Sequence, residues 1–215
     1  MAFLRYLASR WDHLLELAIA HAEVVFISLL IATVIGVTTG VLVYRRERSA
    51  EVVLAVTSTF LTIPSFALFG LLLPIFGLGW TPTVFALVMY ALLPIVRNTV
   101  VGLRSVDPAI TESAQGMGMN GLQRLLRIEL PLAWPVILTG MRVSTLIIIG
   151  IAAIAAYVNG PGLGEDIFSG LSRIGSAVAL NLVLGAVLAI IALALLFDGF
   201  FAVLGKLTTS RGLND

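Results

Sequence analysis

The sequence predicts an all-α, polytopic transmembrane bundle of about five helices. Three observations support this fold class: hydrophobic residues make up 59% of the 215 residues, charged residues only 12%, and the mean hydropathy is +1.06. Because soluble domains contain roughly 25% charged residues, a chain of this composition needs lipid as its solvent. At about 20 residues per crossing, the length allows five or six spans and leaves no room for a second large soluble domain.

Residues 1–23 form an N-terminal segment in which charged and apolar residues are mixed. Arg5, Arg10 and three acidic residues are spread through it, whereas a cleavable signal peptide needs a charge-free core. We therefore expect an amphipathic, interfacial segment here. The first span is expected at residues 24–44, which carry no charge and are long enough to cross the bilayer.

The second and third spans are expected within residues 52–96. This stretch carries no charge and is too long for one crossing, and a cluster of turn formers interrupts it at residues 77–82. We expect the chain to fold back there. Three prolines, Pro64, Pro74 and Pro94, are expected to kink these two spans and to provide irregular backbone that can line a path.

Two more spans complete the expected bundle. The fourth is expected at residues 132–158, with Arg142 inside it, and the fifth at residues 174–204, which is mostly free of charge. The transmembrane domain then covers residues 24–205. A short tail remains at residues 206–215.

The basic residues indicate which way the bundle is inserted. Cytoplasmic loops retain Lys and Arg, and an external N-terminus puts nine of the thirteen basic residues on the inner side. We therefore expect the N-terminus outside and the C-terminus inside, in a multi-pass protein of the cell (inner) membrane. Three segments then face the cytoplasm: a short loop at 45–51, a long loop at 97–131 and the tail.

The long cytoplasmic loop has helix signals of its own. Asp107 can cap a helix that starts at Pro108, whose missing N–H costs nothing at that position, so a helix is expected at residues 109–115. A glycine-containing turn follows it. A second amphipathic helix is expected at residues 121–128 and should end at Leu130-Pro131, where the fourth span begins. The loop is therefore expected to lie along the membrane face as helix, turn and helix.

This loop also carries a gapped motif of twenty residues. Glu112-Ser113-Ala114 is followed by three residues, Gly118, nine residues, Ile128, one residue and Leu130-Pro131. The spacing resembles the cytoplasmic signature of ABC importer permeases, with Ser113 in place of the first alanine. The resemblance implies a MetI-like ABC permease fold, in which this coupling loop (97–131) carries a coupling helix that docks on an ATPase subunit. It assigns the ATPase contact to Glu112, Ser113, Ala114, Gly118, Ile128, Leu130 and Pro131.

Two further segments resemble the permeases of osmoprotectant importers. They are TIPSFALFG at residues 62–70 and NGPGLG at 159–164. The resemblance implies uptake of glycine betaine, carnitine, choline or a similar quaternary amine. It also implies three kinds of partner: two ATPase subunits, an extracytoplasmic substrate-binding protein, and a second copy of the chain or a homologous permease. A permease for another small solute, such as an amino acid, stays open as the alternative.

The sequence offers no catalytic constellation. It contains no Gly-x4-Gly-Lys-Ser/Thr phosphate loop, so ATP hydrolysis is expected on a separate subunit. The chain has no cysteine, and His13 and His21 are expected to be interfacial or structural, so we expect no metal site and no cofactor. These features predict a transport subunit rather than an enzyme. None of them indicates a nucleic-acid partner.

An ion-coupled secondary transporter is the alternative from a different class. Such a protein needs an acidic group at mid-membrane and commonly has inverted repeats. The candidate acids, Glu23 and Asp198, are both expected near span ends, so the sequence favours the ATP-driven importer.

Five residues are candidates for the translocation path. Arg142 follows Pro131 by eleven residues, which places it about 16 Å into the bilayer. A charge at that depth should face the bundle interior or water and have a partner, either in the path or as a structural contact. Aromatic faces can receive a quaternary ammonium, although such rings also serve in packing; the candidates are Phe66, Phe69, Tyr90 and Tyr157.

The outer turn at residues 160–164 is followed by two acidic residues, Glu165 and Asp166. This segment is expected to lie outside the membrane. It either helps to receive the substrate-binding protein or is a solvated loop.

Overall fold

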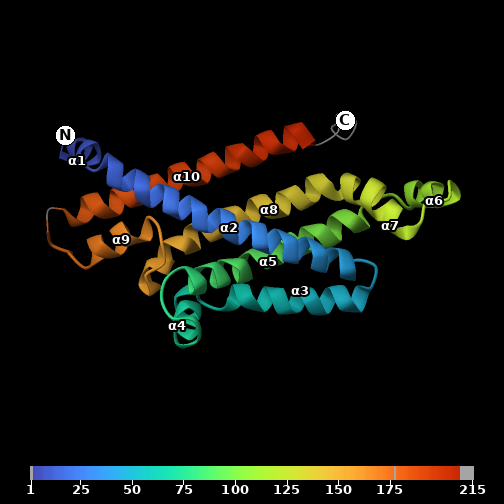
Figure 1. Ribbon diagram of the computed structural model, residues 1–215, viewed down its shortest axis with the longest axis horizontal. Helices are drawn as coiled ribbons and strands as arrows, with labels where there is room; N and C mark the ends of the chain where they lie inside the picture. The colour runs from blue at the N-terminus through green and yellow to red at the C-terminus, as the bar shows by residue number, and fades with distance from the viewer. Residues whose placement is uncertain (1, 177, 209–215) are drawn as a thin grey trace.

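The structure is a computed structural model that describes residues 2–176 and 178–208, and within them every regular element is helical (Figure 1). The elements in chain order are α1 (Ala2–Ser9), α2 (Trp11–Val43), α3 (Glu47–Thr62), α4 (Ser65–Phe76), α5 (Trp80–Arg104), α6 (Pro108–Gly116), α7 (Gly121–Arg124), η1 (Leu125–Glu129), α8 (Leu130–Ala152), η2 (Ala153–Val158), α9 (Gly164–Leu171) and α10 (Ala179–Thr208).

The helices confirm the predicted transmembrane bundle. Four segments of the described chain are long and apolar enough to cross a membrane: α2, α5, the continuous segment 121–158, and α10. The bent pair of α3 and α4 gives a fifth. Helix α2 runs without a break through residue 23, so the first span shares one helix with the end of the N-terminal segment. Most of the predicted tail at 206–215 lies outside the described residues.

The long helices α2, α5, α8 and α10 run alongside one another, with α3 beside them (Figure 1). Helix α5 packs against both α2 and α8, and a Cβ atom at Gly40 would lie 2.6 Å from Thr99, so α2 and α5 approach closely there. The coupling loop, with α6 and α7, projects from the end that also holds the turn between α2 and α3. Helices α1 and α9 lie at the opposite end.

The predicted second span is broken. Helix α3 ends at Thr62, α4 begins at Ser65, and the two axes differ by 97°. The break falls at Pro64, as expected for a residue whose ring and missing N–H oppose helix continuation. The hydroxyl of Tyr90 on α5 donates to the carbonyl oxygen of Ile63 at 2.7 Å, which satisfies one backbone group freed by the break.

The prediction that the second loop helix ends at Leu130-Pro131 is wrong. Helix α7 continues through the π-helical turn η1 into α8, so residues 121–158 form one segment. In the π turn, the Leu130 N–H donates to the carbonyl oxygen of Leu125, five residues earlier. Pro131 sits in the first turn of α8, where its lack of an N–H is tolerated. The wider turn therefore lets the helix pass the proline.

Candidate functional site

Helix α6 presents the first part of the motif. The Asp107 carboxylate accepts from the Ala109 N–H at 2.8 Å and caps the helix, as its sequence predicts. Glu112 and Ser113 are exposed, whereas Ala114 is buried. Because the three motif residues differ in exposure, α6 offers a charged and a hydroxyl side chain outward and holds its small residue inward.

Gly118 forms the turn between α6 and α7. Its φ of +85° is a conformation that side chains with a Cβ rarely adopt, and no atom lies within 4 Å of the place a Cβ would take. The Asn120 side chain then caps α7 by accepting from the Gln123 N–H at 2.9 Å, and the Gln123 side chain accepts from the Asn120 N–H. Side-chain hydrogen bonds therefore fix the turn, and its Gly118 side is open to a partner.

Large apolar side chains are exposed on the same loop. Met117 is 72% exposed and Leu122 is 65% exposed, and Ile110 and Leu126 are also exposed. These residues surround the open Gly118 turn along the chain. Exposed apolar groups collected on a projecting polar loop are typical of a protein-binding surface.

Glu129 lies at the base of the loop and is buried, with 4% exposed. Its Oε1 accepts from Arg124 Nε at 3.0 Å and from Arg45 Nη2 at 3.1 Å, and its Oε2 accepts from the Tyr44 hydroxyl. Arg124 also donates from Nη1 to Gln115 Oε1 at 3.1 Å. A buried carboxylate requires such partners. We call Tyr44, Arg45, Gln115, Arg124 and Glu129 the Glu129 cluster.

Two further contacts fix Tyr44. Arg45 Nε donates to its hydroxyl at 2.5 Å, and Arg104 Nε, at the end of α5, donates to its carbonyl oxygen at 2.8 Å. Burial, followed by the hydrogen bond to the Glu129 carboxylate, raises the pKa of Tyr44 above its ordinary value. The hydroxyl therefore keeps its proton at neutral pH and acts as a donor to Glu129.

The motif is thus split between two places. Glu112, Ser113, Ala114 and Gly118 lie on the projecting part of the loop, whereas Ile128, Leu130 and Pro131 lie where the helix enters the bundle. Leu130 packs against the buried cluster of Leu103, Ala133 and Ile137. Sequence reasoning missed Tyr44, Arg45 and Glu129. The signal for Glu129 was an acidic residue at the one free position between Ile128 and Leu130, directly after a basic helix.

The comparison with known families covers most of the chain. Residues 32–210 match the family described as the binding-protein-dependent transport system inner membrane component. The chain belongs to this family. It is accordingly a multi-pass membrane permease, which confirms the predicted family and the predicted localisation.

Several permeases of known systems are similar to this one over nearly their whole length. The osmoprotectant import permease protein OsmW of Salmonella typhimurium is 38% identical, over 99% of this chain and 100% of its own. The choline transport system permease protein OpuBB of Bacillus subtilis is 32% identical, over 97% and 94%. The carnitine transport permease protein OpuCB of Listeria monocytogenes is 38% identical, over 94% and 85%.

A solved structure supports the fold. An inward-facing structure of the MetNI methionine ABC transporter matches with a TM-score of 0.81 at 21% identity, covering 92% of this permease and 96% of the matched chain. The expected MetI-like architecture is therefore confirmed.

The aromatic path candidates of the permease divide into two groups. Phe69 and Tyr90 are buried in the core. Phe66 on α4 and Tyr157 on η2 are 50% and 44% exposed, and their ring centroids lie 4.1 Å apart. The structure therefore brings Phe66 and Tyr157 together beside the break at Pro64, whereas Phe69 and Tyr90 lie within the core.

Arg142 lies apart from the aromatic pair, on the face shared by α8 and α10. Its Nε is 2.5 Å from Asp198 Oδ1 and its Nη2 is 2.6 Å from Oδ2. The expected partner thus exists, and Asp198 lies ten residues before the end of α10 at Thr208. The side chains of Arg142 and Asp198 are 44% and 32% exposed, and Arg142 lines a pocket of about 280 Å³.

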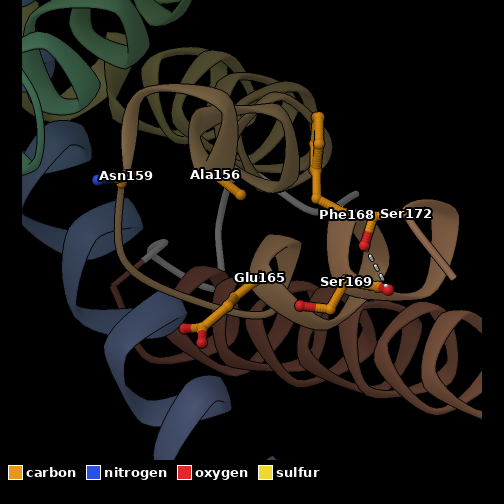
Figure 2. A pocket seen from close by; sticks show the side chains of 7 residues that line it. Ala156, Asn159, Glu165, Phe168, Ser169 and Ser172 are labelled. Carbon is orange, nitrogen blue, oxygen red and sulfur yellow. Dashed lines mark hydrogen bonds between the residues drawn. The ribbon is translucent and has the colours of Figure 1, made fainter.

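A second pocket, of about 520 Å³, lies at the end of the permease opposite the coupling loop (Figure 2). It lies between α9 and the turn after η2, and Glu165 and Phe168 are among its lining residues. Glu165 is exposed, whereas Asp166 is buried and its Oδ1 lies 3.0 Å from His13 Nε2. Of the two acids predicted to receive a partner, only Glu165 is therefore available at the surface.

Proposed function

We propose that this permease is the membrane subunit of an ATP-driven importer for quaternary-amine osmoprotectants such as glycine betaine, carnitine or choline. The observation that carries the substrate class is the similarity over nearly full length to permeases named for osmoprotectant, choline and carnitine transport. The observation that carries the ATP-driven mechanism is the projecting loop with its motif, open glycine turn and exposed apolar side chains.

The coupling loop is the docking site for the ATPase in this proposal. Glu112 and Ser113 offer polar contacts, Met117 and Leu122 offer apolar contacts, and Gly118 allows a partner surface to approach the backbone. One ATPase subunit would bind each of two permease chains. The loop end is cytoplasmic in this assignment, in agreement with the basic residues that gather there.

Substrate would arrive at the opposite end. The external binding protein is proposed to dock over the pocket beside α9, where Glu165 is exposed and can meet a basic group of that partner. Asp166 contributes by holding α9 against α2 through His13 rather than by contacting the partner.

The path is proposed to run past the aromatic pair. Phe66 and Tyr157 offer half-exposed ring faces to a quaternary ammonium, which is attracted to the negative face of an aromatic ring. Irregular backbone at membrane depth is tolerated where it lines a cavity or is covered by protein, and the break at Pro64 lies directly beside this pair. Arg142 and Asp198 line the path nearer the coupling loop, where their exposed sides need water or protein.

The test is reconstitution of the permease with its partner ATPase in liposomes, with binding protein supplied outside. We expect uptake of radiolabelled choline, carnitine or glycine betaine that requires both ATP inside and the binding protein outside. Uptake that persists without the ATPase would show a secondary transporter. ATP-dependent uptake of an amino acid but of none of the three amines would overturn the substrate class.

A further inference from the structure

Glu129 joins parts of the permease that are distant in sequence. Its carboxylate is bonded on one side to Arg124 in the coupling loop and on the other to Tyr44 and Arg45 in the turn between α2 and α3. Arg124 continues the connection to Gln115 on α6. One buried carboxylate therefore holds the coupling loop against the α2–α3 turn.

Stability is a poor explanation for this arrangement. A buried ion pair gains little over apolar packing, because desolvation of the charges offsets their attraction. The same cluster is well suited to fixing geometry, since both carboxylate oxygens are occupied and a shift of either side breaks charged hydrogen bonds. A displacement of the loop is therefore passed to the α2–α3 turn instead of being absorbed between them.

The α2–α3 turn leads toward the proposed path. Helix α3 starts at Glu47, three residues after Tyr44, and continues to the break at Pro64. Beyond the break, Phe66 meets Tyr157, which lies at the far end of the segment that starts with α7. The coupling loop thus has two connections to the aromatic pair: a covalent one through α8 and a second one through Glu129 and α3.

We propose that Glu129 is a positioning residue that transmits the movement of the coupling loop to α3, so that α3 and α8 move together when the ATPase closes. This inference rests on the proposed ATP-driven function. It adds a role for a residue at the unspecified position of the Ile-x-Leu-Pro segment, and it assigns Tyr44 and Arg45 to the same device.

The test compares Glu129→Gln with Glu47→Gln in the reconstituted complex. Both variants exchange a carboxylate for an amide near the same turn, but Glu47 is exposed and takes no part in the cluster. The readout is the amount of substrate imported per ATP hydrolysed. We expect Glu129→Gln to lower this ratio roughly tenfold, the effect of losing charge-assisted hydrogen bonds, and Glu47→Gln to leave it unchanged.

The distance between α3 and α6 is a second readout, and it would not change if Glu129 only stabilised the fold. Because the permease has no cysteine, spin labels can be placed by Arg48→Cys on α3 and Gly116→Cys on α6, with a cysteine-free ATPase. In the otherwise unchanged permease we expect the distance between the labels to stay constant when ATP binds. In Glu129→Gln we expect it to change, because the loop then moves without α3.

The outcomes separate the inference from the function on which it rests. No ATP-dependent uptake by the unsubstituted complex would overturn the proposed function. Normal uptake with an unchanged ratio in Glu129→Gln would overturn only the role of Glu129. If Glu129→Gln does not assemble, Tyr44→Phe removes the hydroxyl's hydrogen bonds to Glu129 and Arg45 and leaves both ion pairs of Glu129 in place. We expect a smaller loss of coupling, and a normal ratio in that variant overturns the inference.

Discussion

Arg142 on α8 and Asp198 on α10 are 56 residues apart in sequence and form a two-point ion pair between the helices. Each charge needs the other at membrane depth. We expect Asp198→Asn to leave Arg142 uncompensated and to reduce sharply both the amount of folded permease and its thermal midpoint. The double variant Arg142→Gln with Asp198→Asn should recover most of the loss. Size-exclusion chromatography after heating measures both.

Asp12→Asn is the control for this pair, because Asp12 is exposed in the first turn of α2. It should behave like the unsubstituted permease. Equal stability of Asp198→Asn and the unsubstituted protein would contradict the structural role of the pair.

The turn at Gly118 gives a second prediction. Gly118→Asp forces a side chain into a backbone conformation of φ +85° and projects it into the proposed ATPase contact. We expect normal membrane insertion with uptake close to zero while the ATPase continues to hydrolyse ATP. Gly175→Asp is the matched control, since Gly175 has φ +95° and equally open surroundings but lies before α10 at the opposite end. Normal uptake by Gly118→Asp would exclude the docking assignment.

The hydrogen bond from Tyr90 to Ile63 predicts a local effect at the broken span. Tyr90→Phe leaves the Ile63 carbonyl without this donor, and we expect the free energy of unfolding to fall by on the order of 1 kcal/mol. Tyr157→Phe removes a hydroxyl that makes no hydrogen bond within the described part of the chain, and it keeps the exposed ring. Denaturation in detergent should therefore separate the two variants; equal midpoints would argue against the support at the break.

The aromatic pair predicts a change in substrate affinity. Phe66→Leu keeps an apolar side chain but removes the ring face, and we expect the KM for the quaternary amine to rise about two- to fivefold with little change in ATP hydrolysis. Phe76→Leu is the control, because Phe76 forms a similar pair with Phe85, with centroids 4.9 Å apart, elsewhere on α4 and α5. An equal rise in both variants would show a packing effect rather than substrate contact.

The span positions could be predicted from sequence because lipid imposes them directly. The charge-free stretches correspond to helices α2 to α5, and the chain turns at 77–79, the first half of the expected turn, because α5 already begins at Trp80. The loop helix begins at Pro108, as its capping residues indicate. These features depend on residues close together in the chain. Local chemistry therefore determined them.

The contacts that complete the site could not be predicted in the same way. The need of Arg142 for a partner followed from its depth, but the choice of Asp198 depends on how α8 and α10 pack. Tyr44 and Glu129 are 85 residues apart and meet only in the fold. The three prolines also differ: Pro64 breaks its span, whereas Pro74 and Pro94 lie inside continuous helices. A single proline cannot indicate from sequence whether neighbouring groups will satisfy the backbone it frees.

The π turn at Leu125–Glu129 changes what the motif spacing means. In a flexible loop, one inserted residue would add slack and little else. In an unbroken helix, an insertion between Arg124 and Ile128 turns everything before it by about 100° around the axis of α8. Leu122 would then face away from the proposed ATPase contact, and Arg124 would point away from Glu129. The number of residues between Gly118 and Ile128, nine, therefore sets the orientation of the loop side chains around the axis of α8. A loop of the same composition but different length would not keep that orientation.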